Sequence, residues 1–323
     1  MKRRFCRIAA GILSIYLCAA TVFARELVPV GKVIGLELSA GTVTVAAFDD
    51  NFTCAREAGL QIGDALVSID GTPIRSASDV RQALNRSDGT VELTVSRDGR
   101  EQHLRLSPEI SASGPKLGIF LKQGITGIGT VTFYDPATHR FGTLGHGVND
   151  SKGKLLPMTQ GNAYAANVIS VQKGKAGDPG QLKGTLTDAR FLGSLSGNTD
   201  RGVFGTAQDG WTGEAIPVAA AEEVRLGGAV IRSTVDNGSP REYSVEILKI
   251  YPKNRDNSRN LLIRVTDPAL LEATGGIVQG MSGSPIIQDG KLVGAVTHVL
   301  VNDPTRGYGI FIENMLDAAE GGD

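Results

Sequence analysis

Short apolar segments that alternate with turns dominate the chain from about residue 116 to residue 315. Apolar and polar residues alternate with a period of two in these segments, which is typical of half-buried strands. The clearest segments are Ile128–Phe133, Ala229–Ser233, Tyr243–Ile250, Leu261–Val265, Pro285–Gln288 and Leu292–Val296. Strands without covering helices bury their apolar faces by closing into barrels or stacking as sheets. We therefore expect a mainly β fold, with an all-β barrel or a pair of barrels over residues 116–323.

A smaller mixed α/β domain is expected over residues 28–106. Alternating apolar residues predict strands at Val43–Val45, Ala65–Ile69 and Val91–Val95. Between them a short helix ends at Gly59, and Ser78 is placed to cap a second helix. Residues 107–115 are rich in serine, proline and glycine, and they are expected to form a linker to the barrels.

This small domain resembles a PDZ domain. The likeness lies in Ala58-Gly59-Leu60, Gly63-Asp64, Ile69-Asp70-Gly71 and the upstream run Gly31-Lys32-Val33-Ile34-Gly35-Leu36. PDZ domains hold the C-terminal carboxylate of a peptide on backbone N–H groups, and the peptide adds a strand to a sheet edge. The resemblance therefore implies that Val33, Ile34, Gly35 and Leu36 bind peptide. The alternative interpretation is that Gly35 is only a turn glycine in a small barrel.

The first 24 residues differ in kind from the rest of the chain. Lys2, Arg3 and Arg4 precede an apolar run from Ile8 to Phe23, and small residues stand towards its end. This pattern predicts a signal peptide or an N-terminal membrane anchor over residues 1–24. We therefore expect a protein that is exported across the cytoplasmic membrane, with membrane association through the leader as an open alternative.

Composition limits the cofactors and partners to be expected. The net charge is −1, and no basic stripe interleaved with aromatic residues is present, so nucleic acid is not an expected partner. The four histidines stand singly, without the spacing of metal ligands, so neither a metal nor another cofactor is expected. Cys54 is the one cysteine beyond the leader, so the exported part forms no internal disulfide.

A serine between glycines marks the candidate nucleophile. In Gly280-Met281-Ser282-Gly283-Ser284-Pro285 the glycines permit a tight turn, which aims backbone N–H groups at a developing oxyanion. We expect Ser282 to be the nucleophile and the N–H groups of Gly280 and Ser282 to form the oxyanion hole. Ser284 is a weaker candidate because the proline after it restricts its backbone. The alternative is that Ser282 is a turn residue between two strands.

A serine hydroxyl needs a base, and the base needs a third group to hold its tautomer. His146, in the glycine-rich run Gly142-Thr143-Leu144-Gly145-His146-Gly147, is the candidate base, and His298 is placed to line the same cleft. The residues alone leave the acid open among Asp150, Asp188, Asp267 and Asp303. Asp267 stands before Pro268 at a predicted helix start, so its simplest interpretation is an N-cap.

The region 116–315 resembles the sporulation stage IV B peptidase (SpoIVB) family of PDZ-containing serine peptidases. The shared segments are Gly127–Phe133, Asp135–Thr138, Phe141–Gly147, Gly193-Ser194, Asn198-Thr199, Gly202–Gly205 and nearly all of Thr266–Glu313. The resemblance implies a trypsin-like double β-barrel with His146 as base, Ser282 as nucleophile and Asp267 as the acid. The choice of Asp267 comes from this resemblance.

The resemblance also implies a biological role. Members of the family are exported into the space between forespore and mother cell, where they cleave themselves. They then cut a component of the membrane complex that restrains a pro-sigma-factor-processing protease. Two alternatives compete with this role of a serine endopeptidase: a non-catalytic PDZ adaptor that binds peptides, and a quality-control protease of the HtrA type. The order of domains argues against the HtrA type, in which the PDZ domain follows the protease.

Overall fold

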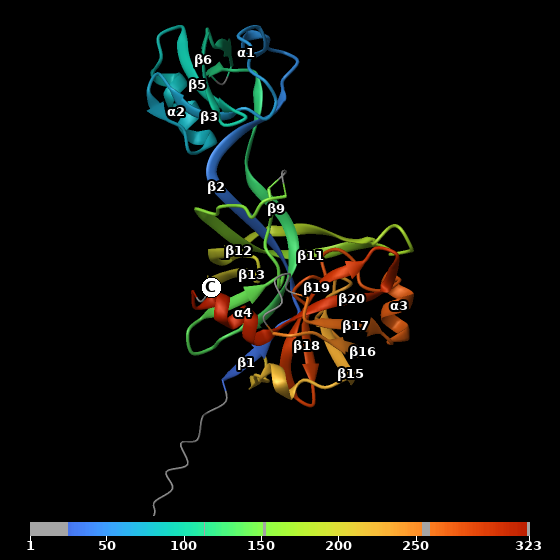
Figure 1. The fold of residues 1–323 in the computed structure, drawn as a ribbon. Coiled ribbons are helices and arrows are strands. Elements are labelled where there is room, and N and C mark those ends of the chain that lie inside the picture. The colour runs from blue at the N-terminus through green and yellow to red at the C-terminus, as the bar shows by residue number, and fades with distance from the viewer. Residues whose placement is uncertain (1–24, 113, 151–152, 254–258, 322–323) are drawn as a thin grey trace, which may run out of the picture.

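The computed structural model describes residues 25–112, 114–150, 153–253 and 259–321. Two β-barrels lie side by side, and a smaller domain stands above them on a long two-stranded ribbon (Figure 1). The expected mainly β fold with a pair of barrels is confirmed. The predicted leader, residues 1–24, lies outside the described residues.

Six antiparallel strands close the first barrel, in the order β2-β9-β10-β13-β12-β11, and β11 pairs with β2 to complete the ring. Alternate side chains of these strands point inward and form its core, as Ile34, Leu36 and Leu38 do in β2. Two short strands, β1 and β14, extend the same sheet past β9. The bounds are β1 Glu26–Pro29, β2 Val33–Phe48, β9 Ile119–Tyr134, β10 Arg140–Thr143, β11 Gln160–Gln172, β12 Gln181–Thr199, β13 Gly202–Ala207 and β14 Ile216–Pro217.

The second barrel is also closed and has six antiparallel strands, in the order β15-β16-β17-β20-β19-β18. Its core includes Val33, Ala166, Val168 and Leu182 of the first barrel, so this apolar cluster extends across the boundary between the two barrels. The bounds are β15 Gly227–Ser233, β16 Arg241–Ile250, β17 Leu261–Val265, β18 Pro285–Gln288, β19 Lys291–Leu300 and β20 Asp303–Phe311; the helices are η1 Ala221–Glu223, α3 Pro268–Thr274 and α4 Ile312–Ala319.

The PDZ domain is inserted between β2 and β9. These two strands pair along both domains, from Val33↔Thr130 in the barrel to Phe48↔Ile119 in the PDZ domain. Helix α2 covers a separate apolar core formed with β3, β5 and the far ends of β2 and β9. The bounds are α1 Cys54–Glu57, β3 Ala65–Ile69, β4 Thr72–Pro73, α2 Ala77–Arg86, β5 Val91–Arg97, β6 Arg100–Leu106, β7 Glu109–Ser111 and β8 Gly114–Lys116.

This insertion corrects two predicted boundaries. The PDZ domain was expected to begin at residue 28, but β1 and the first half of β2 belong to the first barrel because they pair with β9 and β11. The expected linker, residues 107–115, contains most of a two-stranded hairpin, β7–β8, whose second strand packs against α2. Local composition indicated a breaker-rich stretch, but of its two prolines Pro108 precedes β7 and Pro115 lies within β8.

No helix among the described residues is both long enough and apolar enough to cross a bilayer.

Candidate active site

The candidate nucleophile lies in a tight loop between α3 and β18. Gly280 and Gly283 adopt φ angles of 97° and 95°, a region that favours glycine. At Gly283 the backbone also passes close to β9, because a Cβ atom there would lie 2.0 Å from the Thr130 carbonyl oxygen. The glycines on both sides of Ser282 are therefore required by the backbone of this loop.

Strand β9 of the first barrel holds this loop of the second barrel. The Thr130 N–H donates to the Ser282 carbonyl at 2.9 Å, and the Thr130 hydroxyl donates to the Gly280 carbonyl at 2.8 Å. The Thr132 hydroxyl donates to the Gly283 carbonyl at 2.8 Å. Both threonines are fully buried. With its carbonyls held on the β9 side, the loop is fixed in one orientation.

The N–H groups expected to form the oxyanion hole are available in this loop. Met281, Gly283 and Ser284 each donate their N–H to a backbone carbonyl. Within the described part of the chain, the N–H groups of Gly280 and Ser282 have no protein acceptor. Unbonded, partly exposed N–H groups beside a serine hydroxyl are what stabilisation of an oxyanion requires.

His146 follows β10, across a turn in which Leu144 and Gly145 both have a φ of 69°. This turn packs on the nucleophile loop and on β19. A Cβ atom on Gly145 would lie 2.9 Å from Thr297 Cγ2, and one on Gly283 would lie 2.5 Å from the Leu144 nitrogen. The structure thus brings His146 and Ser282 to the same junction between the two barrels.

A backbone carbonyl fixes the tautomer of His146. Its Nδ1 lies 2.9 Å from the carbonyl oxygen of Gly147. Because that oxygen can only accept, Nδ1 carries the proton, and Nε2 of the neutral ring is left with a free electron pair. Burial lowers the pKa of His146 below its usual 6.5, and the Gly147 hydrogen bond opposes this change only in part. His146 is therefore a neutral base near pH 7.

His298 lies against His146, with ring centroids 5.1 Å apart. Burial is the largest cause, and the neighbouring His146 and Arg259 act in the same direction; together they lower the pKa of His298 from 6.5 to about 4. Among the described residues, its buried Nδ1 has no hydrogen-bond partner. His298 thus lies beside the candidate base, as expected, and its ring is neutral at physiological pH.

The Ser282 hydroxyl donates to the Thr297 carbonyl at 2.8 Å. Among the described residues, no hydrogen bond joins Ser282 to His146. The hydroxyl must therefore turn away from Thr297 before a base at His146 can accept its proton. The arrangement is that of a resting site with its parts adjacent and its proton-transfer contact unmade.

The carboxylate of Asp267 caps helix α3. Its Oδ1 accepts from the N–H groups of Ala269 and Leu270 at 2.9 and 3.0 Å, and its Oδ2 accepts from Ser244 N–H at 3.3 Å. No hydrogen bond from His146 reaches it within the described part of the chain. The structure shows the N-cap that the local sequence indicated, and the role of Asp267 as orienting acid stays a prediction.

Two of the other candidate acids have hydrogen-bond partners other than His146. Asp150 accepts from Lys154 N–H, and Asp303 accepts from Thr305 and pairs with Arg306. The side chain of Asp188 lies outside the described residues.

The residues predicted to bind peptide, Val33, Ile34, Gly35 and Leu36, lie outside the PDZ domain, and their binding of peptide stays a prediction. These residues lie in the barrel half of β2, paired with β9 on one side and β11 on the other, so they form no free edge of the PDZ domain. The PDZ domain has its groove elsewhere, between α2 and the start of β9. An apolar depression of about 360 Å³ there is lined by Val80, Arg81 and Leu84 of α2 and by residues 116–121.

The run Leu117-Gly118-Ile119-Phe120 has the features expected of a carboxylate-binding loop. Gly118 has a φ of 67°, and a Cβ atom there would lie 2.3 Å from the side chain of Phe52. Within the described residues, the N–H groups of Leu117 and Gly118 have no protein acceptor. Sequence reasoning missed this segment although its pattern of glycine between apolar residues matches that of Ile34-Gly35-Leu36. Only the strand pairing tells the two apart.

Comparison with known proteins gives relatives that match part of the chain. A putative zinc metalloprotease of Rhizobium meliloti (strain 1021) is 31% identical over 129 residues, which are 40% of this chain and 33% of that protein. Another from Agrobacterium fabrum (strain C58) is 32% identical over 129 residues, 40% of this chain and 32% of its own length. The chain thus spans about a third of the length of these relatives. No group of three His, Cys, Asp or Glu side chains that could hold a metal is found among the described residues.

Solved structures give only loose matches. The active form of the Rv3671c protease from M. tuberculosis matches with a TM-score of 0.36 and 18% identity, over 62% of this chain and 76% of that one. The HtrA-type protease AlgW with a tripeptide matches with a TM-score of 0.37 and 13% identity, over 61% of this chain and 56% of that one.

Family models match both parts of the chain. The model described as a PDZ domain matches residues 52–97, within the inserted domain. The model described as SpoIVB peptidase S55 matches residues 114–316, which is more than half of the chain and includes the second barrel and all of the first barrel except β1 and β2. The chain therefore belongs to the SpoIVB peptidase S55 family and is a serine peptidase that carries a PDZ domain.

Proposed function

We propose that this protein is an endopeptidase in which Ser282 is the nucleophile, His146 is the general base and the N–H groups of Gly280 and Ser282 form the oxyanion hole. The observation that carries this proposal is the pair of N–H groups left without protein acceptors beside the hydroxyl of Ser282. One such donor is worth about 3–4 kcal/mol of transition-state stabilisation in a serine peptidase.

The proposed reaction has two halves. His146 Nε2 takes the proton of Ser282 Oγ as that oxygen attacks the carbonyl carbon of the scissile bond, and the negative charge of the new oxyanion is received by the two N–H groups. The C–N bond then breaks and His146 gives its proton to the leaving amine. Water repeats the attack on the acyl-enzyme and releases the acid. Before the first step, the Ser282 hydroxyl leaves the carbonyl of Thr297.

We assign Asp267 as the third member of the catalytic set on the strength of family membership. The Gly147 carbonyl already holds the Nδ1 proton of His146 in the resting arrangement. A carboxylate in its place would stabilise the imidazolium that forms during the reaction, which a neutral carbonyl does less well. This assignment needs the end of α3 to move, because Asp267 now caps that helix.

The PDZ groove is proposed to dock the C-terminal end of a peptide or protein. Its apolar lining fits an apolar C-terminal side chain, and Arg81 adds a positive charge beside the backbone N–H groups of Leu117 and Gly118. We expect Arg81→Glu to weaken the binding of a peptide with a free C-terminus at least tenfold, because two carboxylates would then face each other. Arg86→Glu, on the same helix outside the groove, is the matched control. Equal affinities of the two variants in fluorescence anisotropy would remove the docking proposal.

We further propose that the protein acts after export, in a sporulation signalling cascade, where it cleaves itself and a component of the membrane complex that restrains a pro-sigma-factor protease. Family membership supports this role. A strain that carries Ser282→Ala is expected to accumulate the unprocessed pro-sigma factor. Normal processing in that strain would contradict the cascade role and leave the peptidase activity itself untouched.

The catalytic proposal is tested with a fluorophosphonate probe, which reacts only with an activated serine. We expect the wild-type protein to be labelled and to cleave itself slowly, and Ser282→Ala to do neither. Ser284→Ala, two residues further on, serves as the control and should keep both properties. If wild type and Ser282→Ala behave alike, the enzyme proposal fails, and a peptide-binding adaptor would be the better account.

A further inference from the structure

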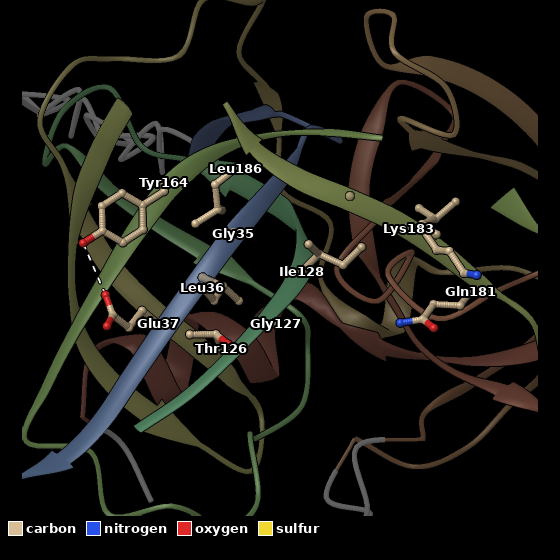
Figure 2. Close-up of a pocket in the computed structure, with 12 residues that line it drawn as sticks. Gly35, Leu36, Glu37, Thr126, Gly127, Ile128, Tyr164, Gln181, Lys183 and Leu186 are labelled. Atoms are coloured by element: carbon tan, nitrogen blue, oxygen red, sulfur yellow. Dashed lines mark hydrogen bonds between the residues drawn. The ribbon is translucent and has the colours of Figure 1, made fainter. Parts of the chain in front are cut away.

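We propose that the pocket between β2, β9, β11 and β12 of the first barrel receives a bulky apolar side chain of the substrate. The proposal rests on the peptidase function proposed above and adds a preference to it. The pocket has a volume of about 660 Å³, which is ample for one large side chain and part of the neighbouring backbone. Figure 2 shows it lined by side chains from all four strands.

The interior of the pocket is apolar. Leu36 and Leu182 line the pocket and are almost fully buried. Ile128 and Leu186 also line it (Figure 2). Leu186 lies directly against β2, because a Cβ atom on Gly35 would be 2.1 Å from Leu186 Cδ2. Half of the Leu186 side chain is exposed, so this residue has apolar surface left to cover.

The polar groups of the pocket stand at its rim and are satisfied or solvated. Glu37 accepts a hydrogen bond from the Tyr164 hydroxyl at 3.3 Å. Lys183 and Gln181 lie on the far side of Ile128 from this pair and are exposed (Figure 2). A charged or polar side chain would find no buried partner inside, and its desolvation would be uncompensated. An apolar side chain suffers no such penalty, and its burial is favourable.

Two residues that line the pocket pack against the nucleophile loop. Leu182 N–H donates to the carbonyl of Gln279 at 2.8 Å. A Cβ atom on Gly280 would lie 3.0 Å from Leu182 Cβ and 3.2 Å from Ile128 Cδ1. Two residues of the pocket thus touch the glycine that supplies one N–H of the proposed oxyanion hole. A peptide whose scissile carbonyl occupies that hole passes the mouth of this pocket within a few residues.

Two variants change the pocket in opposite directions. Thr126 is exposed at its edge, so Thr126→Trp narrows the pocket without disturbing the core. Leu186→Ala removes a half-exposed wall and widens it. Thr206→Trp is the matched control, because it adds the same ring at an exposed position on β13 of the same barrel.

The assay is cleavage of a mixed peptide library by the full chain, with products read by mass spectrometry and Ser282 labelled by a fluorophosphonate in parallel. We expect wild type to favour Leu, Ile, Met or Phe at one position near the cut. At that position, Thr126→Trp should change the ratio of kcat/KM for large residues to kcat/KM for small residues at least about tenfold in favour of the small ones. Leu186→Ala should change this ratio in favour of the largest residues. Labelling of Ser282 in both variants reports whether the nucleophile itself is still reactive.

The outcomes separate the pocket from the catalytic proposal. If wild type cleaves and is labelled but Thr126→Trp and Leu186→Ala keep its preference, or change it no more than Thr206→Trp does, the pocket proposal is wrong and the peptidase proposal stands. If wild type neither cleaves the library nor reacts with the probe, the peptidase proposal fails and the pocket proposal fails with it.

Discussion

Removal of one hydroxyl from β9 tests whether the first barrel holds the nucleophile loop of the second in its reactive orientation. Thr132→Val keeps the size and β-branching of the side chain and deletes the donor to the Gly283 carbonyl. Both partners are buried, so the carbonyl is left without this hydrogen bond and away from water. Such a loss costs about 1–3 kcal/mol of unfolding free energy.

Part of this cost is expected to appear in the reaction. If the loop relaxes, the N–H groups of Gly280 and Ser282 no longer point at the oxyanion. A loss of the same 1–3 kcal/mol from transition-state stabilisation corresponds to a fall in kcat of about 5- to 150-fold. KM should change little, because the hydrogen bond is remote from the parts of the substrate bound before the reaction. Urea unfolding gives the stability change, and cleavage of a fluorogenic peptide gives kcat and KM.

A second buried threonine supplies the control. The Thr234 hydroxyl donates to the Gly31 carbonyl at 3.0 Å, between the barrels, and in the described part of the chain it makes no hydrogen bond to the nucleophile loop. Thr234→Val should lose a similar amount of stability and keep its kcat at temperatures where it is folded. If Thr132→Val also keeps its kcat, or if both variants lose activity in proportion to stability, the argument that β9 aims the loop is refuted.

Three further predictions concern the titratable groups of the site. Because burial lowers the pKa of His146, kcat/KM should hold its plateau to a lower pH than 6.5 and fall only as the ring is protonated below it; a midpoint at or above pH 6.5 would contradict the burial argument. The pKa of His298 falls from 6.5 to about 4 on folding, so between these pH values the unfolded chain binds a proton that the folded chain does not. The free energy of unfolding should therefore drop by at most about 3 kcal/mol as the pH falls from 6.5 to 4. His298→Gln should remove most of this slope in urea unfolding, and the exposed-site control His103→Gln should retain it; parallel slopes for all three proteins would overturn the prediction. Asp267→Asn keeps an oxygen to cap α3 and removes the charge, so it should lower kcat by several orders of magnitude with little loss of stability. If kcat is undiminished, the Gly147 carbonyl is the group that orients His146.

The strands and the local turns of this protein could be predicted from its sequence. Alternation in segments such as Leu261–Val265 follows from one buried face, and the burial of that strand alternates accordingly. Asp267 before Pro268 indicated a helix start, and it caps α3. Both signals depend on residues that are neighbours along the chain.

The features that could not be predicted depend on pairing between distant residues. Gly31–Leu36 and Leu117–Phe120 carry the same pattern of glycine among apolar residues, and only the register Val33↔Thr130 and Phe48↔Ile119 assigns one to a barrel and the other to the PDZ groove. The hydrogen bonds from Thr130 and Thr132 to the nucleophile loop join residues about 150 positions apart. No local pattern marks such threonines among the others of the chain.

Strand β9 fixes the spacing between docking and cleavage. Ten residues separate Phe120, beside the PDZ groove, from Thr130, which is bonded to the nucleophile loop. At about 3.4 Å per residue the strand spans at most about 34 Å between them. On the proposed function, a substrate held by its C-terminus and cut at Ser282 would bridge a similar length, so its scissile bond should lie about ten extended residues before its end. The ribbon would then set the distance between the docked end of a substrate and the bond that is cut.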